Sequence, residues 1–183
     1  MNPKLQITIT RFNTPLGEMI AGATDKGLLL FDFNRRRMID SILTRIKTAN
    51  NAELVEGDHY YFPILKEQFK QYLNGERKNF ELPLLFSGTN FQQRVWNELV
   101  KIPYGEIRSY KQQAFAMGDI KAIRAVAKAN GENCFAIIVP CHRVISENRN
   151  LTGYAGGLAK KKWLLNFERK NSAKELQVTL FED

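Results

Sequence analysis

The stretch 109–131, SYKQQAFAMGDIKAIRAVAKANG, decides how the second half of this chain folds. Ser109 and Gln112 form a capping-box pattern, which predicts a short helix that a glycine ends. Asp119 is a preferred N-cap residue for a second helix over 120–130, again followed by a glycine. Two helices joined by a tight glycine turn predict a helix-turn-helix.

The second of these helices carries a row of basic residues. Lys121, Arg124 and Lys128 are three and four positions apart, so they share one helical face. Ala125 lies beside them, and a small side chain there lets the helix backbone approach a phosphate chain. A solvated charged surface is the alternative interpretation, but the pattern favours DNA binding.

Upstream, the sequence predicts one more helix and a separate N-terminal unit. Thr89 and Gln92 form another capping box, followed by apolar residues at helical spacing up to a Pro-Tyr-Gly stop. Polar and apolar residues alternate over 6–12, which is typical of a half-buried strand. Turn signals bound two further segments, 18–23 and 28–33, which we also expect to be strands. Two amphipathic helices follow, containing Ile39, Leu43 and Ile46, and then Leu65, Phe69 and Leu73.

These patterns predict an α+β protein of two domains. We expect a small N-terminal mixed domain of sheet and helix over 1–85, with an extended connector over 80–85. A winged helix-turn-helix-like domain should cover 86–170, and 171–183 should form a C-terminal tail.

Composition and charge limit the class of protein. The 183 residues are 44% hydrophobic and 25% charged, which is typical of globular chains. No apolar run reaches the roughly 18 residues that a membrane span requires, and the N-terminus lacks a secretory signal pattern. The formal net charge of +8 comes from residues 86–170, which predicts a polyanionic partner. Two cysteines are too few for a disulfide framework, so we expect a reducing, cytoplasmic setting.

The candidate chemistry follows an apolar run. Residues 136–139, AIIV, predict a short buried strand that ends at Pro140 and Cys141. A free thiol has a pKa near ~8.5, and His142 and Arg143 could favour its thiolate. A histidine can also carry the proton away when a carboxylate orients it. A buried structural cysteine with a histidine beside it by chance is the alternative.

The surrounding residues resemble one known family. Four segments resemble the DNA-binding and active-site domain of O6-alkylguanine-DNA alkyltransferases. They are GTNFQQRVWNELVKIPYGEIRSY (88–110), RAVAKANGEN (124–133), IIVPCHRVI (137–145) and LTGYAGGLAKKKWLLNFE (151–168). The resemblance implies a ribonuclease H-like fold for the N-terminal domain. It also implies direct, single-turnover transfer of an alkyl group from guanine O6, or from thymine O4, to a cysteine.

The resemblance implies the following roles. Cys141 is the alkyl acceptor, and His142 with Glu168 forms the network that deprotonates it through a water. Asn133 ties the active-site turn together, and Tyr110 donates its hydroxyl toward the guanine ring. Residues implied to line the lesion pocket are Tyr110, Val144, Tyr154, Ala155 and Gly156. Residues implied to contact DNA are Arg124, which fills the gap left by the extruded base, Lys121, Lys128 and Ala125.

Further expectations concern partners and departures from the family. The partner is double-stranded DNA bound in the minor groove, the protein is a monomer, and no cofactor, metal or membrane is involved. Cys134 stands where the family usually has proline, and we interpret it as a small apolar filler. His59 has no cysteine near it, so a structural zinc is not indicated. Alternatives are a non-enzymatic lesion sensor, a winged-helix regulator and a Cys-His hydrolase.

Overall fold

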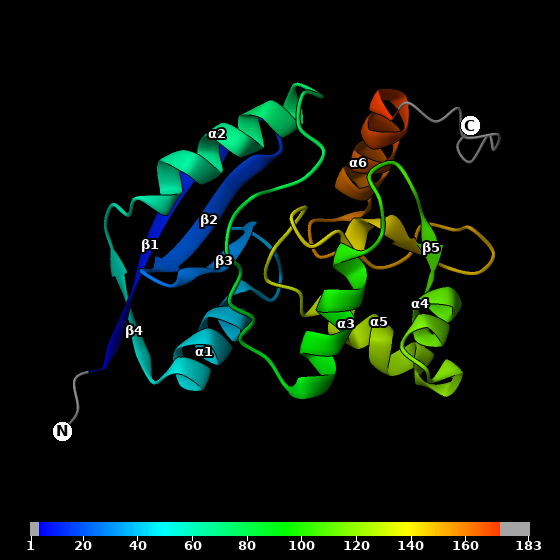
Figure 1. Ribbon diagram of the computed structural model, residues 1–183, viewed down its shortest axis with the longest axis horizontal. Coiled ribbons are helices and arrows are strands. Elements are labelled where there is room, and N and C mark those ends of the chain that lie inside the picture. The colour runs from blue at the N-terminus through cyan, green and yellow to red at the C-terminus, as the bar shows by residue number, and fades with distance from the viewer. Residues whose placement is uncertain (1–3, 173–183) are drawn as a thin grey trace.

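The computed structural model describes residues 4–172, with a sheet at one end and a group of short helices at the other (Figure 1). The first half contains β1 (Leu5–Thr14), β2 (Gly17–Thr24), β3 (Gly27–Phe33), α1 (Ile39–Asn50), β4 (Ala52–Glu56) and α2 (Tyr61–Leu73). The second half contains α3 (Asn90–Val100), β5 (Arg108–Ser109), α4 (Tyr110–Ala116), η1 (Ile120–Ala122), α5 (Ile123–Gly131), η2 (Cys141–Arg143), β6 (Val144–Ile145) and α6 (Leu158–Asn171), where η marks a 3-10 helix. The predicted α+β class is confirmed.

The sheet has the strand order β3-β2-β1-β4. The strands β1, β2 and β3 form an antiparallel meander, and β4 pairs in parallel with β1 after the crossover through α1. The helices α1 and α2 lie on either side of this sheet (Figure 1). The three strands of the meander were predicted. The strand β4 was not, because its five residues, AELVE, are largely exposed and show little apolar alternation.

The free edge of β3 is covered by chain from elsewhere. Leu28 forms a bridge with the connector at Leu84, and Phe31 forms one with Phe135 of the second half. Phe31 N–H donates to the Cys134 carbonyl at 2.9 Å, and its own carbonyl accepts from Ala136 N–H at 2.7 Å. Every residue of β3 is therefore buried.

One hydrophobic core runs through both halves, and Phe31 of β3 meets Phe135 of the second half within it. For this reason the division of the chain into domains 1–85 and 86–170 stays a prediction. The predicted tail 171–183 lies outside the described residues beyond Ser172.

The predicted helix-turn-helix has one irregularity. Both capping boxes are present, at Thr89 and at Ser109. The helix expected over 120–130 is instead split into η1 and α5, and Asp119 caps the first piece by accepting from Lys121 N–H at 2.9 Å. The indole N–H of Trp96 donates to the Ala129 carbonyl at 2.8 Å and ties α3 to α5.

The strand predicted over 136–139 was wrong. Beyond the single bridge at Phe135, the segment folds as turns in which Ile137 has a φ of 72°. Its amides bond locally: Ile138 N–H donates to the Ala136 carbonyl and Val139 N–H to the Phe135 carbonyl. An apolar run indicates burial, but periodicity alone does not distinguish a buried strand from a buried turn.

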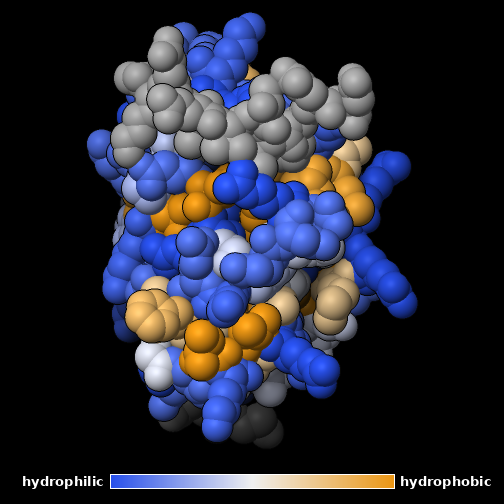
Figure 2. All heavy atoms as spheres, turned by 90° about the vertical axis from the view of Figure 1, so that its right-hand side faces the viewer, coloured by the Kyte–Doolittle hydropathy of each residue, from blue (hydrophilic) through white to orange (hydrophobic). Residues whose placement is uncertain are grey.

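The face that carries α4 and α6, on the right of Figure 1, is mostly hydrophilic and has small hydrophobic patches (Figure 2). Among residues 4–172, no helix has both the length and the apolar character required to cross a membrane.

Candidate active site

Asn133 organises the turn between α5 and η2. Its side-chain Oδ1 accepts from Phe135 N–H at 2.9 Å, and its Nδ2 donates to the Val139 carbonyl at 2.9 Å and the Phe135 carbonyl at 3.3 Å. These bonds satisfy backbone groups that a strand would have paired with a neighbour. They close a compact loop that ends at Cys141.

Cys141 begins η2 and is 8% exposed. Asn133 Nδ2 also donates to its Sγ, over 3.3 Å. Burial raises the pKa of the Cys141 thiol above its ordinary value, and the bond from Asn133 is the largest opposing effect. At rest the Cys141 sulfur is therefore a thiol, and it needs a base to become a nucleophile.

His142 is placed to act as that base. It is fully buried, and its Nε2 lies 2.8 Å from Glu168 Oε1. Burial lowers the pKa of His142, with Glu168 opposing the shift. The ionised carboxylate of Glu168 can only accept a hydrogen bond, so the proton of the neutral imidazole is on Nε2. The other ring nitrogen, Nδ1, is therefore left as an acceptor. Within residues 4–172 that Nδ1 has no hydrogen-bond partner.

Glu168 is held by more donors than the sequence suggests. Arg143 donates to it through Nε at 2.8 Å and Nη2 at 3.0 Å, Tyr72 through its hydroxyl at 2.7 Å, and Gly105 through its N–H at 3.2 Å. Burial acts to raise the pKa of Glu168, but His142 and Arg143 outweigh it and hold that pKa well below its ordinary value. Glu168 is thus an anion at neutral pH.

Arg143 does not support the thiolate in the way its position in the sequence suggests. Besides Glu168, its guanidinium donates to the Ile102 carbonyl at 2.6 Å. These hydrogen bonds thus hold the carboxylate and the turn after α3 rather than the sulfur of Cys141.

Cys141 opens onto a cavity of about 540 Å³ between α5, the loop after β3 and the loop before α6. Its wall includes the predicted pocket residues Tyr110, Tyr154 and Ala155. The predicted pocket residues Val144 and Gly156 are not part of its lining: Val144 is fully buried, and Gly156 lines a smaller cavity of about 130 Å³. The full lining is Arg36, Arg37, Met38, Tyr110, Ile123, Arg124, Ala127, Asn130, Gly131, Cys141, Thr152, Gly153, Tyr154 and Ala155.

Tyr110 keeps its proton in this cavity. Burial, followed by the proximity of Cys141, raises its pKa to about 12. A phenol that stays protonated can donate a hydrogen bond to an atom that gains negative charge.

Two side chains that the sequence did not reveal hold the walls. Lys161 is fully buried, and its Nζ donates to the carbonyls of Val144 at 2.6 Å and Thr152 at 2.8 Å. Arg36 pairs with the buried Asp32 and donates to the Asn133 carbonyl at 2.8 Å. Lys161 stands in a run of three lysines, which predicts exposure, so no local signal identified it.

The basic face adjoins the cavity through Arg124. Lys121, Arg124, Ala125 and Lys128 are all exposed, and Arg124 is also part of the cavity wall. A DNA strand that contacts this face would therefore run past the opening above Cys141.

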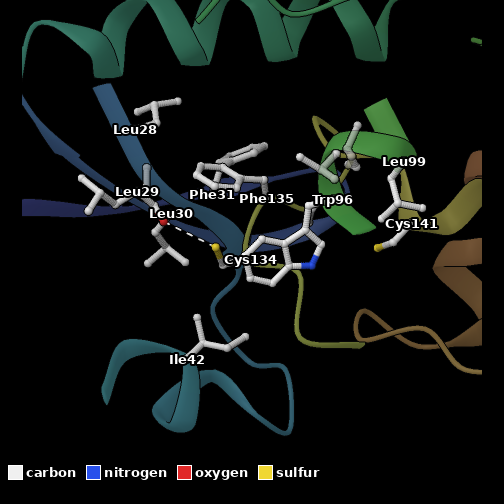
Figure 3. Close-up of a cluster of buried hydrophobic side chains, with 14 of the residues drawn as sticks. Leu28, Leu29, Leu30, Phe31, Ile42, Trp96, Leu99, Cys134, Phe135 and Cys141 are labelled. Atoms are coloured by element: carbon white, nitrogen blue, oxygen red, sulfur yellow. Dashed lines mark hydrogen bonds between the residues drawn. The ribbon is translucent and has the colours of Figure 1, made fainter. Parts of the chain in front are cut away.

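Cys134 is separate from this site. It is fully buried, its Sγ lies 3.5 Å from the Leu29 carbonyl, and burial raises its pKa to about 12. Figure 3 shows it beside β3, with Trp96 between it and Cys141 in this view. The structure supports the interpretation of Cys134 as a core filler.

Two family models match most of the chain. Residues 7–86 match the ribonuclease-like domain of 6-O-methylguanine DNA methyltransferase, and residues 90–170 match the DNA-binding domain.

Individual relatives agree with these matches. The constitutive methylated-DNA–protein-cysteine methyltransferase of Bacillus subtilis is 44% identical over 164 residues, covering 87% of this chain and 94% of that protein. The Mycobacterium tuberculosis enzyme of the same name is 49% identical over 147 residues, covering 78% and 88%. The crystal structure of Mycobacterium tuberculosis OGT in complex with DNA superposes with a TM-score of 0.76 at 35% identity, covering 96% and 99% of the two chains.

Proposed function

The chain belongs to the family of O6-methylguanine-DNA methyltransferases, and we propose that Cys141 is the residue that accepts the alkyl group. Its activity is the direct transfer of an alkyl group from O6-alkylguanine in DNA to a protein cysteine. One observation carries the assignment to Cys141: its thiol is on the cavity wall next to the buried His142–Glu168 pair, whereas Cys134 is in the core.

The proposed reaction begins with ionisation of the thiol. The proton on Sγ passes, through a water, to Nδ1 of His142, and Glu168 stabilises the imidazolium that forms. The thiolate then attacks the alkyl carbon, a carbon–sulfur bond forms, and the bond from that carbon to O6 breaks.

The leaving group is the second part of the proposal. The electron pair of the broken bond stays on the guanine, and Tyr110 donates a hydrogen bond to the charge that develops there. The proton held by His142 then returns to the guanine through solvent. The products are S-alkylcysteine and unmodified guanine, so no cofactor or metal is required.

DNA binding is assigned to the basic face. The target atom lies inside the duplex, so the nucleotide must be extruded into the cavity, and Arg124 would fill the space that it leaves. Lys121 and Lys128 would contact phosphates, and Ala125 would allow close approach in the minor groove. We also propose that the protein works as a monomer in the cytoplasm and accepts alkyl groups from thymine O4.

The assignment is tested by intact-mass analysis after mixing with a duplex that contains O6-methylguanine. We expect a gain of one methyl group in place of hydrogen, and peptide mapping should place it on Cys141. The Cys141→Ser variant should bind the duplex but gain no mass. A methyl group on Cys134, or repair by the serine variant, would overturn the assignment.

Stoichiometry gives a second test. A thioether has no ionisable proton and is a poor leaving group, so the alkylated protein has no route back to the thiol. With lesion in excess, repair should stop at one lesion per protein, with or without added reductant. Several lesions repaired per protein would contradict the proposal.

A further inference from the structure

We propose that Tyr72, on α2 of the first half, is a positioning residue of the alkyl-transfer site, because its hydroxyl holds the same carboxylate oxygen of Glu168 that faces His142. The proposal deepens the function above and rests on the roles given there to Cys141 and His142. It gives the N-terminal half a part in the chemistry.

The contact is short and fixed. Tyr72 is fully buried, and its hydroxyl donates to Glu168 Oε1 at 2.7 Å, while His142 Nε2 lies 2.8 Å from that same oxygen. Four other rings surround the Tyr72 ring, at centroid distances of 5.7–6.4 Å. These rings are Phe69, Phe80, Tyr104 and Phe167. The packing leaves the hydroxyl little freedom to turn away from the carboxylate.

Tyr72 is a permanent donor. Its own burial, followed by the proximity of Glu168, raises its pKa well above the ordinary value, so the phenol does not ionise at any physiological pH. A hydrogen bond to a carboxylate takes up part of its negative charge and makes it less attractive to other protons.

The charge on Glu168 Oε1 determines whether His142 can serve as a base. His142 is faced by Glu168 and Lys161 from α6, by Arg143 next to it in η2, and by the Tyr154 ring. Of these groups, Glu168 favours the imidazolium, while Arg143 and Lys161 disfavour it. Without the Tyr72 hydroxyl, more negative charge would face Nε2. More His142 would then be protonated at rest and unable to accept a proton from Cys141.

The chain offers a matched control in Tyr104. This side chain is 9% exposed, its ring lies edge-on to Tyr72 at 6.0 Å, and Arg143 lies over it at 5.7 Å. In the part of the chain that the structure describes, its buried hydroxyl has no hydrogen-bond partner. The changes Tyr72→Phe and Tyr104→Phe each remove one buried hydroxyl from the same cluster, but only the first removes a bond to Glu168.

The test is the rate constant of methyl transfer, measured in single turnover from a duplex with O6-methylguanine across the pH range. The acid limb should report loss of neutral His142. For Tyr72→Phe we expect its midpoint to rise by about 0.5–1 pH unit, while the alkaline rate stays near that of the unchanged protein. The profile of Tyr104→Phe should superimpose on that of the unchanged protein. Superimposable profiles for both variants, or equal loss for Tyr72→Phe at every pH, would overturn the proposal.

Two further measurements separate this inference from the function on which it rests. The His142 imidazole can be titrated by NMR in the DNA-free protein, and Tyr72→Phe should raise its pKa whether or not Cys141 is the acceptor. Replacing Tyr72 by a fluorotyrosine keeps the packing and strengthens the donor, so the midpoint should move to lower pH. An unchanged His142 titration in both variants would refute the role of Tyr72. A methyl group mapped elsewhere than Cys141 in the unchanged protein would instead refute the proposed function.

Discussion

Replacing Asn133 by alanine should destabilise the protein through the turn that ends at Cys141. Phe135 N–H would lose its acceptor, and a buried donor left unpaired costs about 1–3 kcal/mol. The carbonyls of Phe135 and Val139 would lose one donor each but keep another, from Val139 N–H and Cys141 N–H. Each of these losses costs about 0.5–1.5 kcal/mol.

The sum for Asn133→Ala is therefore about 2–6 kcal/mol, with a central value of about 4 kcal/mol. For a chain of this length each kcal/mol lowers Tm by roughly 2–4 °C, so we expect Tm to fall by about 10 °C. The transfer rate, measured well below that Tm, should fall as well, because the turn no longer fixes Cys141 against His142.

Asn130 provides the control for stability. It is 5% exposed, and neither polar atom of its side chain has a hydrogen-bond partner among residues 4–172. Removing an amide that makes no bond should change the free energy of unfolding by less than about 1 kcal/mol. Thermal and urea unfolding of both variants in the absence of DNA test the reasoning. Equal losses for Asn133→Ala and Asn130→Ala would refute it, because burial of an amide alone would then explain the effect.

Four other outcomes are expected. Arg124→Ala should slow repair of duplex lesions more than transfer from the free alkylated base, because only the duplex has a gap to fill; equal slowing in parallel rate assays would contradict this. Gly156→Ala should lower stability by about 1–3 kcal/mol in urea unfolding, since its Cβ would approach the Phe33 ring to 2.5 Å; an unchanged midpoint would oppose the clash. Because burial raises the pKa of the Cys141 thiol, its alkylation by iodoacetamide without DNA should accelerate steadily from neutral to alkaline pH, and a rate that is flat with pH would argue for a resting thiolate. The S-methylated protein should melt below the unmodified form by calorimetry, because the added methyl crowds a packed site, and a higher Tm would count against that crowding.

The transfer chemistry and the family could be predicted because their signals are local. Cys141 and His142 are adjacent, and the spacing of Ser109 with Gln112 predicts a helix start without knowledge of any distant residue. Glu168 and Asn133 were assigned only through the resemblance, since nothing in their own neighbourhood connects them with Cys141. The structure brings Glu168 to 2.8 Å from His142 and Asn133 to 3.3 Å from the thiol, which supports both proposed roles.

The errors arose where local preference and long-range pairing disagree. The apolar run 136–139 has the composition of a strand, but the Asn133 side chain and local amide bonds occupy the groups that a strand would pair. Lys161 stands in a charged run, yet carbonyls of two separate segments satisfy its ammonium group and allow it to be buried.

By itself the sequence determined the strands of the meander, the capped starts of α3 and α4, the basic face over η1 and α5, and the Cys-His motif, because each depends on residues within a turn or two of one another. Only the tertiary structure decided what surrounds that motif. Tyr72 and Arg36 come from the N-terminal half, yet Tyr72 holds Glu168 beside His142 and Arg36 holds Asn133 beside Cys141. Such contacts form because one core covers the edge of β3 and brings Tyr72 of α2 against Phe167 of α6, and buried polar groups from distant segments must then find partners in one another. No spacing rule in a sequence encodes that pairing.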